Sequence, residues 1–221
     1  MAGVATSRIA GAAGLLALAA SVVGVLFEAG FPDTRDAAVL SQFVLDHKDM
    51  LLRQSVAFSL SPALLMFLIA GLKTRIARSE GSTFFGDAAF GAGIIWLGLQ
   101  IAAQCLQVGF TLATTSDMPL SMGAISSATA MLTLSGIVGA AFLGATGAGI
   151  LVDRQMPVWF GMLSLVAALA QMLIWMTAVV ESGPFSPVGW TACVLQPFFV
   201  VWLVPASFLM LRDRPHSAEA P

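Results

Sequence analysis

Charged residues are scarce in this chain. Of its 221 residues, only 10% are Asp, Glu, Lys or Arg, whereas 58% are hydrophobic. Soluble globular domains contain about 25% charged residues, so a chain of this composition could not surround one core with a water-compatible surface. The shortage of charge excludes a soluble domain and indicates an integral membrane protein.

Basic residues and cysteines are also few. Ten Lys and Arg against twelve Asp and Glu give a net charge of -2, without the basic patch that would neutralise the phosphates of a nucleic acid. Cys105 and Cys193 both lie in apolar runs and form no CxxC motif. We therefore expect no nucleic-acid partner, no disulfide framework and no zinc site.

Histidine is missing from the apolar stretches. His47 and His216 both lie in polar segments, so no intramembrane imidazole is present to hold a haem or a di-histidine metal site. The apolar stretches also contain no Ser–His pair and no paired carboxylates at one depth. We therefore expect no cofactor and no metal, and we lean away from an enzyme.

Long apolar runs, by contrast, are abundant. A helix crosses a hydrocarbon core of about 30 Å with about 20 residues. Six runs reach this length and predict an all-α, six-span bundle in one transmembrane domain. The first run is longer than the apolar region of a secretory signal, about 7–15 residues, so we expect it to be retained. The predicted spans are Ile9–Phe31, Leu52–Leu72, Ala88–Leu112, Ile125–Leu151, Val158–Val180 and Trp190–Leu211.

The distribution of Lys and Arg predicts the orientation. One side of the predicted membrane has seven basic residues: Arg8, Lys73, Arg75, Arg78, Arg154, Arg212 and Arg214. The other side has three: Arg35, Lys48 and Arg53. Because short loops rich in Lys and Arg stay in the cytoplasm, we predict that both termini are cytoplasmic.

The segment between the first two spans contains a short amphipathic pattern. Leu40, Phe43, Val44 and His47 follow the spacing i, i+3, i+4, i+7, which predicts a helix, with Asp33 or Thr34 as its cap. This helix would either lie on the outer membrane surface or cover the end of the bundle. We favour the first position.

Only two charged residues lie within the predicted spans, and both are near the ends of their spans. Glu28 is near the outer end of the first span and Arg53 near the outer end of the second. They could form an ion pair, or each side chain could extend separately to water. We favour the second alternative. The absence of charge near the midplane also argues against an ion-coupled transporter.

Glutamine forms a stripe on the third span. Gln100, Gln104 and Gln107 have the spacing i, i+4, i+7 and share one helix face, and Gln171 and Gln196 lie at comparable depths in later spans. Such side chains could hydrogen-bond helices together. Alternatively, they could line a site for a small uncharged ligand or a lipid headgroup. We favour packing but retain these five residues as the candidate binding site.

The fourth span has small residues at every fourth position. Gly136, Ala140 and Gly144 belong to this stripe, which lets another helix approach closely. The stripe predicts either a homo-oligomer or a central helix within the bundle.

Two segments resemble a family of bacterial six-helix membrane proteins of unknown function. The fifth span opens with Arg154-Gln-Met-Pro157-Val-Trp159, followed by Phe160-Gly161, and the sixth contains Pro197-Phe198-Phe199-Val-Val-Trp202. The resemblance covers most of the chain. It implies the same fold and a bacterial cytoplasmic (inner) membrane, but neither an activity nor functional residues.

The sequence thus predicts architecture better than function. We expect a non-enzymatic membrane protein that binds a lipid or a small neutral molecule, or that acts as a scaffold among membrane lipids. An uncoupled transporter or permease component is the alternative, and an intramembrane enzyme ranks third.

Overall fold

The computed structural model describes residues 2–28, 32, 36–77, 80–116, 118, 121–180, 183, 185–186 and 190–212. Within these residues the chain is helical and contains no strand, which confirms the all-α prediction. Several residues discussed above lie outside this description: Asp33, Thr34, Arg35, Arg78, Arg214, His216 and the side chain of Cys193. The helices are α1 (Ala2–Leu26), α2 (Ala37–Asp46), α3 (Lys48–Ile76), α4 (Glu80–Ala113), α5 (Met122–Asp153), α6 (Val158–Met176) and α7 (Trp190–Leu211), and a 3-10 turn, η1, follows α6 at Thr177–Val179.

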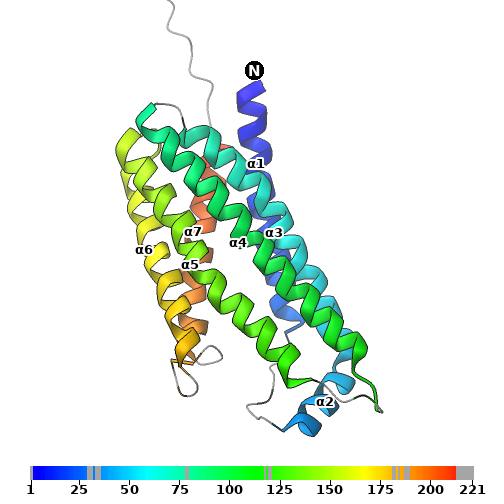
Figure 1. The fold of residues 1–221 in the computed structure, drawn as a ribbon. Coiled ribbons are helices and arrows are strands. Elements are labelled where there is room, and N and C mark those ends of the chain that lie inside the picture. The colour runs from blue at the N-terminus through cyan, green and yellow to red at the C-terminus, as the bar shows by residue number, and fades with distance from the viewer. Residues whose placement is uncertain are drawn as a thin grey trace, which may run out of the picture.

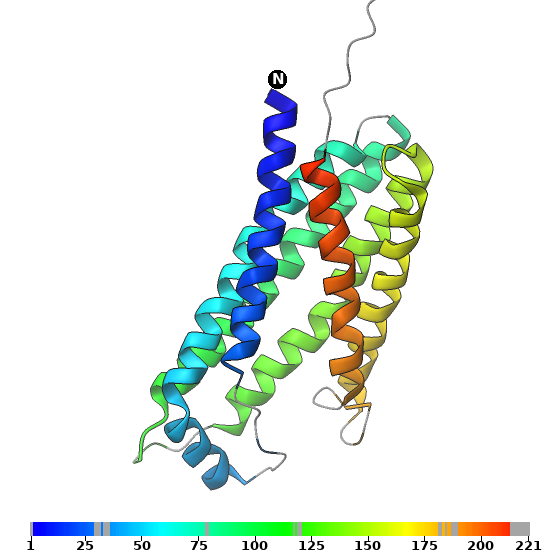
Figure 2. The same cartoon turned by 180° about the vertical axis from the view of Figure 1, so that it is seen from behind.

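Six of these helices are long and apolar enough to cross a membrane, and α2 is the short one. The chain is a multi-pass membrane protein. Each span packs against the spans before and after it, and α7 packs back against α1, so the six form a closed ring in chain order (Figures 1 and 2). The Ser7 hydroxyl donates to the carbonyl of Met210 at 2.8 Å and joins the first span to the last.

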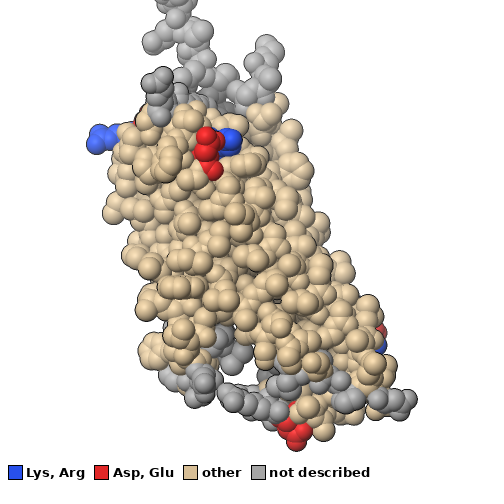
Figure 3. Space-filling model, in the orientation of Figure 1, with Lys and Arg blue, Asp and Glu red and all other residues tan. Residues whose placement is uncertain are grey.

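The start of α1 and the end of α7 lie at one end of the bundle, and α2 lies at the other (Figure 2). Following the predicted orientation, we call these the inner end and the outer end. On the face drawn in Figure 3, charged side chains lie toward the two ends, and the broad middle is free of them. This distribution matches a hydrocarbon band around the middle of the bundle.

The predicted spans are found in the structure: the last one matches α7 at both ends, the fifth begins where α6 begins, and the other ends differ. Four helices are longer than predicted, because a helix continues beyond the hydrocarbon core into the polar layer. The predicted end of the first span, Phe31, lies outside the described residues, and α1 ends before it, at Leu26. Two i-to-i+3 hydrogen bonds, from Phe27 N to Gly24 O and from Glu28 N to Val25 O, tighten the last turn as α1 ends at Leu26. Hydropathy alone does not reveal this turn.

The amphipathic pattern of the external segment is confirmed as α2. Its cap is neither Asp33 nor Thr34 but Asp36, whose carboxylate accepts a hydrogen bond from Ala38 N at 2.8 Å. Leu40 and Val44 are buried against residues of three spans, Leu51, Phe110 and Ala128. This packing fits the position that we did not favour, in which the helix covers the end of the bundle.

The main core fills the inner half of the ring. Five aromatic side chains from four spans meet there: Trp96, Phe142, Phe160, Phe199 and Trp202. Their ring centroids are 4.9–6.0 Å apart, the separation typical of stacked and edge-to-face pairs. We call these five residues the inner aromatic cluster. Large rings that meet near the axis fix the distance between opposite sides of the bundle.

Candidate functional site

Polar side chains gather in the outer half of the ring, on α3 and α4. From α4, Gln104 and Thr111 are buried and Gln107 is half-buried. From α3, Gln54 and Ser55 are buried. We call these five residues the outer polar cluster.

The antiparallel packing of α3 and α4 brings these residues to one level. Ile69 of α3 lies against Gly93 of α4, and Leu51 belongs to the same apolar cluster as Phe110. Because the two helices are antiparallel, a residue nearer the start of α3 lies beside a residue nearer the end of α4. Gln54 therefore lies at the level of Gln107, within one or two helical turns of the other members.

The outer polar cluster contains polar atoms that are buried and have no hydrogen-bond partner within the described structure. These atoms are Gln54 Oε1, Ser55 Oγ, Gln104 Oε1, Gln107 Nε2 and Thr111 Oγ1. The oxygen and nitrogen of a glutamine amide can exchange places by rotation of the amide, so each glutamine can offer a ligand either an acceptor or a donor. A buried polar group without a partner costs about 1–3 kcal/mol. An additional hydrogen-bonding molecule would remove this cost.

Gln100, one turn further in on α4, is different. Its Nε2 donates to the hydroxyl of Ser135 on α5 at 3.1 Å, and that hydroxyl donates to the carbonyl of Leu132 at 2.7 Å. This is the hydrogen bond between helices that the packing interpretation of the stripe predicts. The stripe therefore divides into a bonded inner member and an outer part with unpartnered atoms.

The other two candidate glutamines lie elsewhere. Gln171 is buried on α6, which packs mainly against α5 and α7 rather than α3 or α4. Gln196 is exposed on α7. The structure thus brings together Gln104 and Gln107 but adds neither Gln171 nor Gln196 to them.

Gln54 and Ser55 were not among the residues that we selected from the sequence. They lie close to the outer end of the predicted span, where polar side chains normally face water or headgroups. Helix spacing could have identified them, because both lie within one turn of Leu51, an apolar residue on the same helix. In the structure, Leu51 and Leu65 belong to the buried face of α3. Helix periodicity places Gln54 close to that face.

Glu28 and Arg53 do not come together as an ion pair in the described structure, whereas Lys73 and Asp87 do, at 2.9 Å. The guanidinium carbon of Arg53 instead lies 6.0 Å from the centre of the Phe27 ring. Phe27 precedes Glu28 just after the last helical turn of α1. The early end of α1 therefore places the ring, rather than the carboxylate, beside Arg53.

The small residues of α5 are used within the bundle. A Cβ atom at Gly136 would lie 2.8 Å from the carbonyl oxygen of Gln171, and one at Gly147 would lie 2.8 Å from that of Gly161. Glycine at these two positions lets the backbones of α5 and α6 approach closely. Gly136 of the predicted stripe therefore serves a contact between neighbouring helices of the bundle, and the homo-oligomer through Gly136, Ala140 and Gly144 stays a prediction.

Comparisons of the chain with protein-family models, with curated proteins and with solved structures found no match. The chemistry of the site therefore rests on its residues. The outer polar cluster consists of amides and hydroxyls, without an ionisable side chain. Such groups donate and accept hydrogen bonds but provide neither a strong nucleophile nor a general base at neutral pH. The arrangement is suited to binding an uncharged polar molecule.

Proposed function

We propose that this protein is a non-enzymatic binding protein of the bacterial cytoplasmic membrane, and that its ligand is a small uncharged molecule with hydroxyl or amide groups. The observation that carries this proposal is the set of unpartnered polar atoms in the outer polar cluster. The bacterial membrane is supported by the resemblance of the Arg154–Trp159 segment to bacterial six-helix proteins.

The chemistry of the cluster indicates the class of ligand. Amide oxygens need donors, the amide nitrogen needs an acceptor, and each hydroxyl can do either. A polyol or a small amide carries both kinds of group. An ion fits less well, because the cluster offers no opposite charge against which to offset the loss of hydration.

The position of the cluster fits entry from the outer side. Gln104, Gln107 and Thr111 occupy the outer half of α4, and α2 covers the adjoining end of the bundle through Leu40 and Val44. A ligand held below α2 would be separated from bulk water. In that environment each hydrogen bond is stronger than in water.

Native mass spectrometry of the full chain, released from lipid nanodiscs, tests the proposal. We expect an adduct of defined, small mass on each protomer. We expect Gln104→Leu to abolish the adduct, because it removes an amide with an unpartnered oxygen. The matched control is Gln100→Leu on the same face, which should keep the adduct and lose the bond to Ser135.

Two results would contradict the proposal. One is wild-type protein that carries no small adduct under conditions in which it remains folded. The other is an adduct that persists equally in Gln104→Leu and in Gln100→Leu. Either result would leave hydrogen bonding between helices as the role of the stripe.

A further inference from the structure

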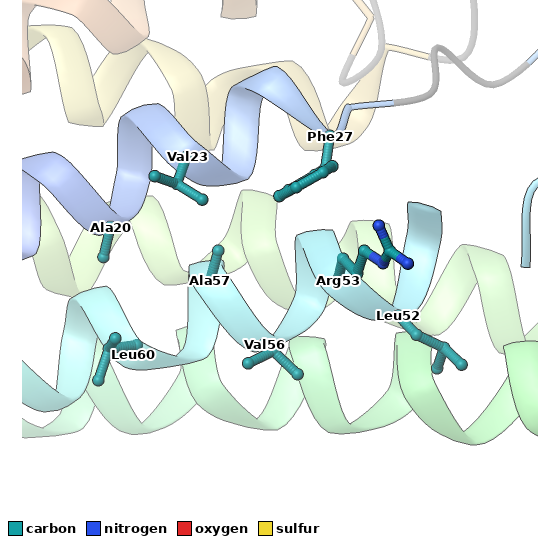
Figure 4. A pocket seen from close by; sticks show the side chains of 8 residues that line it. All are labelled: Ala20, Val23, Phe27, Leu52, Arg53, Val56, Ala57 and Leu60. Carbon is teal, nitrogen blue, oxygen red and sulfur yellow. The ribbon is translucent and has the colours of Figure 1, made fainter. Parts of the chain in front are cut away.

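A separate groove lies between α1 and α3 on the outside of the ring. Its volume is about 500 Å³, within the range of sites that hold small molecules, about 300–1,000 Å³. In Figure 4, Val23 and Phe27 of the α1 segment face Arg53 and Ala57 of α3 across the groove. The complete lining is Ala20, Val23, Phe27, Leu52, Arg53, Val56, Ala57 and Leu60. All of these residues except Arg53 are apolar.

The groove exists because two of its lining residues are small, while the helices are held together beside it. Ala20 and Ala57 fill little of the space between α1 and α3. Next to them the Ser21 hydroxyl donates to the Ser61 hydroxyl at 2.8 Å, and the Phe58 ring packs directly on Gly24. The two contacts fix the distance between the helices, so the groove does not close by moving them together.

The groove spans a defined depth in the membrane. We take the midpoint of α3, Pro62, as the level of the bilayer midplane, and Arg53 lies nine residues outward from it, a rise of about 14 Å. Since half of a hydrocarbon core is about 15 Å, Arg53 lies at the boundary with the headgroups. Val56 and Leu60 lie deeper, within the outer leaflet. From the membrane surface inward, the groove therefore has a positive charge and then an apolar lining. A phospholipid has its phosphate and its acyl chains in the same order.

Arg53 is available to an anion. Its side chain is exposed, and in the described structure it has no carboxylate partner within 4.0 Å. The Phe27 ring contacts one side of the guanidinium, which orients the group without occupying its N–H donors. A guanidinium held in this way can bind a phosphate through two parallel hydrogen bonds.

We propose that the α1–α3 groove binds one anionic phospholipid of the outer leaflet. The phosphate binds Arg53, and one acyl chain lies along Val56, Ala57 and Leu60. The site differs from the outer polar cluster, because Arg53 and Gln54 point to different faces of α3: one lines the groove and the other is buried in the bundle. The inference therefore does not depend on the proposed function.

The full-length protein in a neutral detergent, titrated with phosphatidylglycerol and observed by native mass spectrometry, tests this inference. We expect Arg53→Gln to weaken phosphatidylglycerol binding at least tenfold, since it removes the charge but keeps much of the length. The matched control is Lys48→Gln, which removes a charge at the same end of α3 outside the groove. It should bind as the wild type does. Phosphatidylcholine, which has no net charge, should bind the wild type more weakly than phosphatidylglycerol.

A second pair of variants tests the apolar part of the groove. Val23→Trp places an indole in the groove and should weaken phosphatidylglycerol binding, whereas Val22→Trp places it on a neighbouring, exposed position outside the lining and should not. Both positions are exposed, so neither variant has to repack the core. Normal melting temperatures of both variants would verify this.

Three outcomes would overturn the inference. The first is equal phosphatidylglycerol affinity in the wild type and Arg53→Gln. The second is an equal loss of affinity in Arg53→Gln and Lys48→Gln, which would indicate general attraction between charges. The third is a dimer that Val23→Trp converts to a monomer without a change in lipid binding, which would make the groove a contact between two copies of the chain.

Discussion

The inner and outer halves of the bundle differ in how many of their buried polar atoms have hydrogen-bond partners. In the inner half, Trp202 Nε1 donates to the Ser164 hydroxyl at 2.8 Å, and that hydroxyl donates to a backbone carbonyl at the same distance. Trp96, whose buried Nε1 has no partner within the described structure, is an exception. In the outer half, the amides and hydroxyls of the outer polar cluster have unpartnered atoms. Most of the unpartnered polar atoms among the described residues therefore lie in the outer half of the bundle.

The apolar packing is also more extensive in the inner half than in the outer half. The inner half contains a large continuous cluster with five aromatic rings, and the outer half a small one around Leu51 and Phe110. In a membrane, lipid tails are as apolar as the helix surfaces, so close packing and hydrogen bonds hold helices together. We infer that the stability of the bundle comes mainly from its inner half. The following predictions test this comparison, from the largest expected effect to the smallest.

Trp202→Ala should have the largest effect. Trp202 is fully buried and stacks with two rings of the inner aromatic cluster, so its removal leaves a cavity among α5, α6 and α7. We expect a loss of about 3–5 kcal/mol in the free energy of unfolding, measured by denaturation in mixed micelles. Trp159→Ala, at an exposed tryptophan, is the matched control and should lose less than about 1 kcal/mol. Equal losses would show that the inner cluster does not hold the bundle together.

Gly147→Ala should destabilise the protein by about 1–3 kcal/mol, because the added methyl group would push α5 away from the backbone of α6. The matched control is Gly144→Ala on the same helix. A Cβ atom there would lie 4.0 Å from the Ala168 side chain, an ordinary contact. The difference between the two melting temperatures is the measurement. A Gly147→Ala protein as stable as Gly144→Ala would contradict the close approach of these helices.

Ser164→Ala should lower the free energy of unfolding by about 1 kcal/mol, because it removes the acceptor of a buried indole N–H. The change should also shift the fluorescence of the protein, since the hydrogen bond that the Trp202 indole N–H donates is lost. Unfolding curves of the variant and the wild type, recorded with both circular dichroism and fluorescence, measure the two effects. An unchanged free energy would mean that the inner half does not depend on this bond.

Thr111→Val should have the smallest effect, and in the opposite direction. The variant replaces a buried, unpartnered hydroxyl with a methyl group of similar size. We expect the ligand-free protein to be as stable as the wild type or more stable, by up to about 1 kcal/mol. Delipidated protein unfolded in detergent provides the measurement. A clear loss of stability would reveal a hydrogen bond at Thr111 and weaken the contrast between the two halves.

Much of the fold could be predicted from local sequence. The length of an apolar run and the 3.6-residue period are properties of one segment, and they correctly identified the six spans and the amphipathic helix α2. The end of α1 and the cap of α2 were predicted incorrectly, because one depends on a tightened turn and the other on a single carboxylate-to-amide bond at Asp36. Hydropathy describes neither.

The candidate site could be predicted only in part. The stripe of Gln100, Gln104 and Gln107 lies on one helix and was visible from its spacing. Its division into bonded and unbonded members depends on Ser135 of α5, and its extension depends on Gln54 of α3. The inner aromatic cluster was missed for the same reason. Its members come from four helices, and their meeting is a property of the ring rather than of any one helix.

The hydrogen bond from Ser7 to Met210 has a consequence for the biosynthesis of this bundle. During synthesis α1 is made before the other five spans and α7 after them, so the seam between α1 and α7 can form only after α7 has been made. Until then, the surface of α1 around Gly11 and Gly14, which α7 later covers, faces lipid or an insertion factor. Closure of the ring is therefore a late event, and truncation before Trp190 would leave the ring open at α1.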